Sequence, residues 1–181
     1  MEKSDMDKRN IVLIGMPSCG KSTVGVLLAK KLGYKFVDSD LLIQEVEGRL
    51  LHEIIAEEGI DRFIQIEERV NLGIGTPGSR TESGCIVATG GSAVYGRAAM
   101  ERFYDTSLVV YLKMTYEETK KRLGNFSHRG VVMPDGYDLK RLYDERCALY
   151  ERYAHVTVDE EKVSGDIGAT LDELYRILQE K

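Results

Sequence analysis

One glycine-rich segment constrains the fold of this chain more than any other. Residues Gly15–Ser22 read GMPSCGKS and fit the pattern GxxxxGK[ST]. A short β-branched run, Ile11–Ile14, precedes the segment, and an amphipathic stretch, Lys21–Leu32, follows it. In this strand–loop–helix setting the glycines let the loop curl, so that successive backbone N–H groups point inward at phosphate oxygens. The segment therefore predicts a phosphate-binding loop between a buried strand and a helix.

Within this loop the side chains have separate expected tasks. Lys21 is expected to reach the β- and γ-phosphates of a nucleotide, and Ser22 is placed to ligate Mg²⁺. The helix that begins at the loop adds the positive end of its dipole. Cys19 has two interpretations: a reactive thiol near a helix N-terminus, or simply a small residue that fits the loop. The residues predicted to bind nucleotide are Gly15, Ser18, Cys19, Gly20, Lys21, Ser22, Thr23 and, from a later helix, Arg122.

Short apolar runs that do not alternate with polar residues predict the strands of the fold. This pattern is typical of strands buried on both faces of a parallel sheet. The predicted strands are Ile11–Ile14, Lys35–Val37, Cys85–Ala88, Leu108–Leu112 and His155–Val158.

Longer amphipathic stretches between these runs predict helices. Val24, Leu27, Leu28 and Leu32 form one apolar stripe, and Ile167, Leu171, Leu174 and Leu178 form another near the end of the chain. Thr115–Glu118 has the sequence of a capping box, and Gly124 is a helix stop. Alternating strands and helices predict an α/β fold with three layers, α/β/α, around a five-stranded parallel sheet.

Length and composition limit the classes of function. The 181 residues suffice for one domain, residues 1–181, and a net charge of −5 lacks the basic surplus of a nucleic-acid-binding protein. The three cysteines show no CxxC spacing, which argues against a disulfide framework or a zinc site. The apolar run Ile11–Ile14 is too short for a signal peptide or a membrane span. We therefore expect a cytoplasmic monomer that binds neither nucleic acid nor membrane.

A phosphate-binding loop alone fits GTPases, ATPases and kinases, so a second motif is needed. The chain lacks the Asn-Lys-x-Asp that reads guanine, and it carries Asp38-Ser39-Asp40 directly after the second predicted strand. Ligands of α/β sheets bind beyond the carboxyl ends of the strands, so both carboxylates should face the phosphates. Two acids there suit one metal-ordering role and one role on a substrate hydroxyl. Alternatively, Asp40 caps a helix that begins at Leu41.

With these motifs the chain resembles the shikimate kinase family, and the resemblance extends over nearly its whole length. Arg146 precedes Leu149 and Tyr150 as in the late Arg-x-Pro-Leu-Tyr element of the family, with Ala148 in place of proline. The other matching elements are the loop Gly15–Thr23, the Asp38–Asp40 segment, the run Ala88–Gly91 and the lid arginine at Arg129.

The resemblance implies transfer of the γ-phosphate of ATP to a small hydroxylated molecule, shikimate above all. Asp40 would orient and deprotonate the accepting hydroxyl, and Gly90 and Gly91 would let the backbone approach the substrate ring. Arg146 would pair with a substrate carboxylate, a task that suits a planar two-pronged cation. Glu67 would lie near the substrate and orient its neighbours.

The resemblance further implies a metal site, a lid and a substrate-binding subdomain. Ser22 and Asp38 would hold Mg²⁺, and Arg129 would close with a lid at about residues 124–136 and neutralise charge on the transferred phosphoryl group. Lid closure would also exclude water. The substrate-binding subdomain would span about residues 40–72, and the catalytic residues would be Lys21, Asp40 and Arg129.

At three places the sequence departs from the family pattern. The family usually has an arginine at the position of Ile64, and Arg62 lies about 200° away on a helix, so it does not substitute. Ser92 stands where the family has a third glycine, and Gly130 follows Arg129 where the family has proline. These changes favour one alternative, a kinase of the same fold acting on another small polyol or hydroxy compound. A nucleotide-binding module without transferase activity is a third hypothesis.

Overall fold

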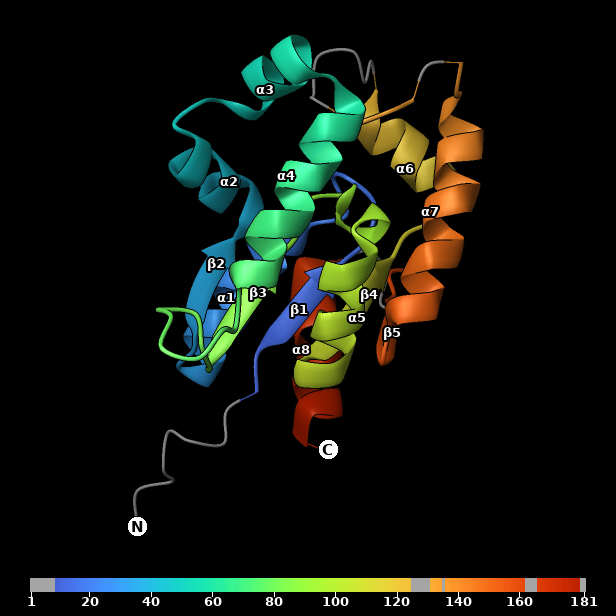
Figure 1. Ribbon diagram of the computed structural model, residues 1–181. Helices are drawn as coiled ribbons and strands as arrows, with labels where there is room; N and C mark the ends of the chain where they lie inside the picture. The colour runs from blue at the N-terminus through green and yellow to red at the C-terminus, as the bar shows by residue number, and fades with distance from the viewer. Residues whose placement is uncertain (1–8, 125–130, 135, 162–165, 180–181) are drawn as a thin grey trace.

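A five-stranded, fully parallel sheet forms the centre of the molecule (Figure 1). The computed structural model describes residues 9–124, 131–134, 136–161 and 166–179. The sheet order is β2-β3-β1-β4-β5, so the loop after the central strand lies at the topological switch point, where α/β folds bind ligands. The strands are β1 (Ile11–Ile14), β2 (Lys35–Asp38), β3 (Cys85–Ala88), β4 (Leu108–Lys113) and β5 (Val156–Asp159).

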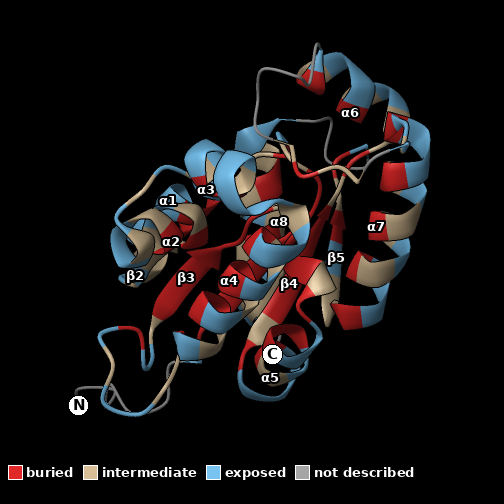
Figure 2. Cartoon of the chain, turned by 45° about the horizontal axis from the view of Figure 1, so that its top comes forward, coloured by how far each residue is buried: buried red, intermediate tan, exposed pale blue. Residues whose placement is uncertain are grey.

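Helices cover both faces of the sheet, which confirms the three-layer α/β/α prediction. Helices α1 (Lys21–Leu32) and α8 (Ile167–Gln179) pack on one face. Helices α5 (Arg97–Thr106) and α7 (Leu139–Tyr153) pack on the other, and α4 (Ile60–Gly73) packs on α5. The central strands are buried on both sides, and β3 and β4 are almost wholly red in Figure 2.

A smaller apolar cluster lies outside the main core. It joins α4 to α2 (Ser39–Glu47) and α3 (Leu51–Glu58), the region predicted to be the substrate-binding subdomain. Val132, which lies within the predicted lid, completes this cluster. The cluster consists of Ile43, Ile54, Phe63, Ile66, Val70 and Val132.

The fold is completed by a 3₁₀ turn, η2 (Ala93–Tyr95), and by α6 (Tyr116–Leu123).

Three details of the helix predictions are wrong. Leu27 is 40% exposed and Ile167 is 42% exposed, so neither belongs to the buried face of its helix. α1 instead buries a narrower stripe around Val24 and Leu28, and Ile167 stands in the first turn of α8, before the helix meets the sheet. The Thr115 hydroxyl accepts a hydrogen bond from the backbone N–H of Glu118, but the Glu118 carboxylate pairs with basic side chains of its own helix rather than completing a capping box.

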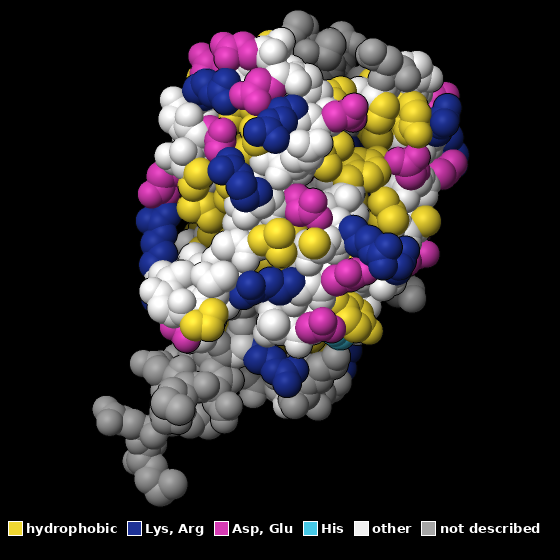
Figure 3. Space-filling view, in the orientation of Figure 1, with side chains coloured by type: hydrophobic (Ala, Val, Ile, Leu, Met, Phe, Trp, Pro, Cys, Tyr) yellow, Lys and Arg dark blue, Asp and Glu magenta, His cyan; other side chains and the backbone are white. Residues whose placement is uncertain are grey.

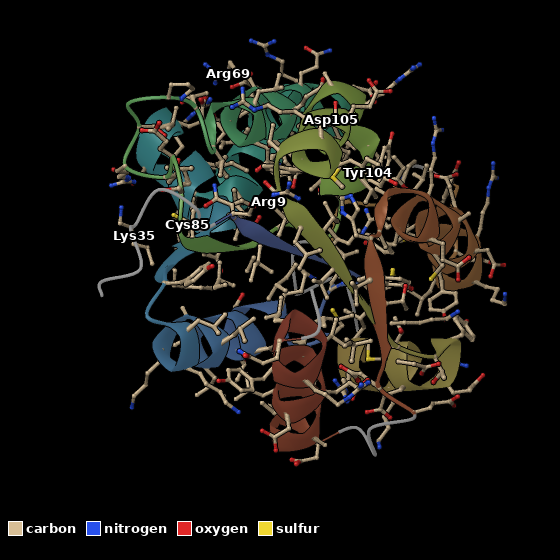
Figure 4. The ribbon with its side chains drawn as sticks, turned by 90° about the horizontal axis from the view of Figure 1, so that it is seen from below. Arg9, Lys35, Arg69, Cys85, Tyr104 and Asp105 are labelled. Atoms are coloured by element: carbon tan, nitrogen blue, oxygen red, sulfur yellow. The ribbon has the colours of Figure 1, made fainter. Side chains whose placement is uncertain are left out.

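At the edge of the sheet opposite the phosphate-binding loop, hydrogen bonds hold a long connection against the strands. Figure 4 shows Lys35 and Cys85 there, at the amino ends of β2 and β3. Asn10 ties the irregular connection of residues 74–84 to this edge, because its amide donates to the Thr81 carbonyl and accepts from the Cys85 N–H, each at 2.9 Å. These contacts hold the connection between α4 and β3 against the amino ends of the strands.

One face of the molecule carries both signs of charge together with hydrophobic side chains (Figure 3). Basic and acidic side chains of the described residues are interspersed over the face drawn in Figure 3. No helix within the described ranges is both long and apolar enough to cross a membrane.

Candidate active site

A pocket of about 590 Å³ opens at the carboxyl ends of the strands. It combines the phosphate-binding loop, the end of β2, the loop after β3 and α7. Apolar side chains of α3, α4 and α6 and of the described part of the predicted lid form its remaining wall. These are Leu51, Ile55, Phe63, Leu123, Val131 and Val132, none of which the sequence had singled out as site residues.

In the phosphate-binding loop, glycine is required by conformation and by space. Gly15 has φ 147°, and a Cβ there would meet the Leu112 carbonyl oxygen at 2.7 Å and the Cys19 sulfur at 2.9 Å. Gly20 has φ 89° and begins α1. Cys19 is 1% exposed, which supports the interpretation that it is a small residue filling the loop from behind. The prediction of a curled glycine-dependent loop is confirmed.

Lys21 is held inside this loop by the loop's own carbonyl groups. Its Nζ donates to the carbonyl oxygens of Gly15 at 2.8 Å and Met16 at 2.9 Å, and the side chain is buried. The ammonium group is thus fixed at the base of the pocket before any phosphate arrives, which lowers the entropy cost of using it.

Asp38 links the loop to the end of β2. Its Oδ2 accepts a hydrogen bond from the Ser22 hydroxyl at 2.9 Å, so the two predicted metal ligands are adjacent. Its Oδ1 accepts from the backbone N–H groups of Asp40 at 3.0 Å and Leu41 at 3.4 Å. Asp38 is therefore the N-cap of α2, and the alternative that Asp40 caps this helix is wrong.

The Asp40 side chain lines the pocket instead. Burial and, second to it, the neighbouring charge of Asp38 raise the pKa of this carboxyl from 3.8 to about 6, although Lys21 acts to lower it. A carboxylate with a pKa close to neutrality accepts a proton more readily than an ordinary aspartate, as a general base requires.

Gly90 and Gly91 leave room that any side chain would fill. A Cβ on Gly90 would lie 2.4 Å from Glu67 Oε1 and 2.8 Å from Asp40 Oδ1. A Cβ on Gly91 would lie 2.8 Å from Pro17 and 3.1 Å from Nη1 of Arg146. The backbone after β3 therefore lies directly against the acidic and basic side chains of the pocket.

Arg146 is fully buried and faces the pocket from α7. Its Nη2 donates to the Val132 carbonyl and its Nε donates to the Tyr95 hydroxyl at 3.4 Å, while the guanidinium lies 5.3 Å from the centre of the Tyr95 ring. These contacts orient the cation in a site with little water, where it would otherwise be costly to bury. The contact between Tyr95 and Arg146 was not predicted, because their pairing depends on how η2 packs against α7.

A second carboxylate, Glu67, lies beneath Gly90. It is 1% exposed, and its Oε2 accepts a hydrogen bond from the Ser92 hydroxyl at 2.6 Å. The pKa of Glu67 is raised to about 7, mainly by burial and also by the charge of Asp40, while the Ser92 hydrogen bond, Arg146 and Lys21 act to lower it. Ser92 was visible in the sequence as a departure from a glycine triplet, but its partner was not.

Two further predicted residues lie at or beyond the edge of the described site. Arg122 donates to the Ser18 carbonyl at 3.4 Å and pairs with Glu160 at 3.0 Å, which places it beside the phosphate-binding loop. Arg129 lies outside the described residues, as does most of the predicted lid.

Ile64 stands on α4 where the family usually has an arginine. Among the described residues, Arg146 is therefore the only arginine that lines the pocket. Ile64 is partly buried and packs against the smaller apolar cluster. Arg62 is exposed and pairs with Glu58, the last residue of α3, which confirms that it does not substitute.

The fold and the pocket together define a class of protein. A phosphate-binding loop with a buried lysine, a hydroxyl–carboxylate pair suited to Mg²⁺ and a buried carboxylate beside a small pocket are the parts of a P-loop kinase that phosphorylates a small molecule.

Comparison with known proteins narrows this class to a family. The shikimate kinase family model matches residues 17–175. The shikimate kinase of Vibrio parahaemolyticus is 33% identical over 97% of this chain and 99% of its own, and that of Vibrio vulnificus is 34% identical over 96% and 98%. The chain belongs to the shikimate kinase family, whose members are ATP-dependent kinases.

Solved structures agree with this assignment. The shikimate kinase of Acinetobacter baumannii in complex with shikimate superposes with a TM-score of 0.79, at 30% identity over 96% of this chain and 92% of that one. The shikimate kinase of Aquifex aeolicus gives a TM-score of 0.79 at 26% identity, over 94% of this chain and 96% of that one.

Proposed function

We propose that this chain transfers the γ-phosphoryl group of ATP to a hydroxyl group of shikimate. The observation that carries the proposal is the partly buried Asp40 carboxylate, which faces one pocket together with Lys21 and Arg146. This arrangement gives a base for a hydroxyl, a cation for phosphate and a cation for a carboxylate. The similar protein from Acinetobacter baumannii has been solved with shikimate bound.

On the nucleotide side, the backbone of residues 15–23 would surround the phosphates of ATP and Lys21 would contact the transferred group. Because phosphate would compete for its ammonium group, Lys21 would exchange the Gly15 and Met16 carbonyls for phosphate oxygens. Ser22 and Asp38 offer the oxygen ligands that Mg²⁺ prefers, and the bound ion would supply positive charge that neutralises the phosphates. Arg122, which donates to the Ser18 carbonyl, would contact the nucleotide beside the phosphate-binding loop.

On the acceptor side, Asp40 would accept the hydrogen bond of the reacting hydroxyl and then its proton. Gly90 and Gly91 would let the acceptor ring lie against the backbone, and Arg146 would pair with its carboxylate. Arg129 and the lid would close over the phosphoryl group and exclude water, with residues 40–72 acting as the substrate-binding subdomain. We place the protein in the cytoplasm as a monomer.

One observation favours a second candidate function. With isoleucine at position 64, Arg146 is left to bind an acceptor carboxylate without help from α4, while Asp40 and Glu67 both present acidic oxygens near Gly90. This balance of charge suits a neutral polyol as well as a hydroxy acid. Transfer to such a polyol is the alternative that the test must distinguish from transfer to shikimate.

The decisive test is release of ADP from Mg-ATP in the presence of shikimate, of no acceptor, and of a panel of cyclitols, sugars and hydroxy acids. Shikimate-dependent turnover with a KM in the micromolar-to-millimolar range is expected. Turnover with another acceptor and none with shikimate would refute the proposal and support the polyol alternative.

A further inference from the structure

A chain of hydrogen bonds connects Arg146 to three side chains that do not line the pocket. Arg146 Nε donates to the Tyr95 hydroxyl at 3.4 Å, and the Tyr95 hydroxyl donates to Glu145 Oε1 at 2.7 Å. The second oxygen of the same carboxylate, Glu145 Oε2, accepts from the Tyr137 hydroxyl at 2.9 Å. The chain thus joins the η2 turn, α7 and the segment directly before α7 at the arginine that faces the pocket.

The chemistry of the groups fixes the direction of these hydrogen bonds. A guanidinium only donates and a carboxylate only accepts, so the Tyr95 hydroxyl accepts from Arg146 and donates to Glu145. Burial raises the pKa of the Tyr95 hydroxyl, and the hydrogen bond to Glu145 also raises it, although Arg146 acts to lower it. The hydroxyl therefore keeps its proton and connects the carboxylate to the arginine through a neutral group.

The protein occupies two of the three guanidinium nitrogens and leaves the third for a ligand. Nε donates to Tyr95 and Nη2 donates to the Val132 carbonyl. Nη1 makes no hydrogen bond within the described part of the chain, and a Cβ on Gly91 would lie 3.1 Å from it. Since Arg146 and Gly91 both line the pocket, Nη1 is the nitrogen available to an acceptor.

Prior orientation of Arg146 is important because this chain has Ile64 where a second arginine is expected. Two cations can share the binding of a carboxylate, whereas a single long side chain that is ordered only on binding loses affinity. The hydrogen bonds to Tyr95 and Val132 order Arg146 before an acceptor arrives. The Tyr95 ring adds to this order, because its centre lies 5.3 Å from the guanidinium.

We propose that Tyr95 and Glu145 are positioning residues that hold Arg146 Nη1 toward the pocket, so that one arginine suffices to select an acceptor with a carboxylate. Tyr95 acts on Arg146 directly, and Glu145 acts through Tyr95. Tyr137 holds the second oxygen of Glu145 and so fixes the rotation of that carboxylate. The inference rests on the proposed function and specifies how its acceptor side recognises the anionic group rather than the reacting hydroxyl.

The first experiment measures KM and kcat for shikimate from the release of ADP. Tyr95→Phe keeps the ring and removes only the hydroxyl, so KM should rise about threefold to tenfold while kcat changes little. Tyr104→Phe, at a 44% exposed tyrosine of α5 that does not line the pocket, is the matched control and should equal the wild type. An unchanged KM in Tyr95→Phe would overturn the positioning role.

Two substitutions at Glu145 test the outer part of the network. Glu145→Ala removes the acceptor of the Tyr95 hydroxyl and should raise KM about as much as Tyr95→Phe does. Glu145→Gln retains an acceptor oxygen of the same shape, so it should restore most of the lost affinity. Equal KM values for Glu145→Ala and the wild type would refute the role of Glu145.

A double-mutant cycle separates this role from a general loss of stability. In an Arg146→Lys background the Nε donor is absent, so adding Tyr95→Phe should leave KM unchanged. The same rise in KM in both backgrounds, with equal melting temperatures, would show that Tyr95 does not act through Arg146 and would overturn the proposal.

The third experiment does not depend on activity. Nitrogen-15 NMR follows the Nε–H group of Arg146, and Arg146→Lys provides the assignment. Exchange of this proton with solvent should be several-fold faster in Tyr95→Phe and in Glu145→Ala than in the wild type, because the hydrogen bond is lost or loosened. Tyr104→Phe should exchange at the wild-type rate, and an unchanged rate in Tyr95→Phe would refute the network.

The outcomes distinguish this inference from the proposed function. If shikimate drives ADP release but Tyr95→Phe and Glu145→Ala keep the wild-type KM, the positioning role is refuted and the function stands. If shikimate neither binds nor reacts, the function is refuted together with the selection of a carboxylate, while the exchange of the Arg146 proton still decides whether Tyr95 and Glu145 hold the arginine.

Discussion

The proposed nucleotide side and the proposed acceptor side of the pocket are built in different ways. The nucleotide side comes from one continuous segment, Gly15–Thr23, together with Asp38 at the end of β2. The acceptor side brings together Asp40, Glu67, Gly90 and Arg146 from α2, α4, the β3 loop and α7. A contiguous site is specified by local sequence, whereas an assembled site depends on how several elements pack.

The two sides also differ in the groups that bind. Backbone N–H groups would dominate around bound phosphates, so a variable side chain such as Cys19 is accommodated as long as the loop keeps its shape. Side chains would dominate around a bound acceptor, so replacements such as Ile64 and Ser92 rearrange the contacts. This difference explains why family resemblance is strong in one half and altered in the other.

The largest expected effect tests the nucleotide side. Lys21→Ala should lower kcat roughly a thousandfold, because the charge held at the base of the loop no longer stabilises the transferred phosphoryl group. Lys30→Ala, an exposed lysine in the last turn of the same helix, is the control and should retain activity. Turnover that survives Lys21→Ala would remove the basis for the phosphate-binding role of the loop.

On the acceptor side, Gly90→Ala should reduce kcat/KM for the acceptor about a hundredfold, since the new methyl group would displace Glu67 and Asp40 from their positions. The affinity for ADP should change little, which would confirm that the two sides are separable. Gly73→Ala is the control, because a Cβ at the end of α4 meets nothing within 4 Å. Equal loss of ADP binding would contradict the comparison.

A smaller effect is expected from pH. A fall in pH should lower the activity and raise the stability of the fold. If Asp40 acts as the base, kcat/KM should fall about tenfold per pH unit below its pKa of about 6. Folding raises this pKa from 3.8, so the folded state holds the proton more tightly than the unfolded chain does. The stability that Asp40 contributes is therefore present below pH 3.8 and is lost as pH rises through about 6, by about 1–3 kcal/mol.

The control for this prediction is Asp40→Asn. This variant should be inactive and should melt at a higher temperature than the wild type at pH 8, with the two converging near pH 4. A wild type whose melting temperature rises from pH 5 to pH 8 relative to the variant would show the opposite sign and refute the role of burial at Asp40.

The smallest expected effect is a lower KM for shikimate. Ile64→Arg should lower KM for shikimate about threefold to tenfold, because a second guanidinium becomes available to the acceptor carboxylate and to Glu67. Gln65→Arg adds the same charge to the exposed face of α4 and should have no effect. An unchanged KM in Ile64→Arg, with the fold intact, would indicate that the acceptor side is shaped for a different molecule.

Local sequence was sufficient for the fold class and for the conformation of the glycine-rich loop. The strands β1 and β3 have the predicted bounds, because short apolar runs buried on both faces leave a strand few alternatives. The Gly15–Ser22 pattern fixed the loop, because its conformation depends on glycines that are close in the chain. Burial of Leu27 and Ile167 was predicted wrongly, since a periodic stripe shows which side of a helix is apolar but not how wide its contact with the sheet is.

Only the tertiary structure decided the acceptor side. The sequence indicated that Ser92 and Ile64 were unusual, but the hydrogen bond from Ser92 to Glu67 joins residues 25 positions apart on different elements. The same holds for Arg146, which Tyr95 and Val132 orient from two other segments. Sequence determines which side chains are present, but burial sets their ionisation and packing sets their partners, and both arise only when distant segments meet.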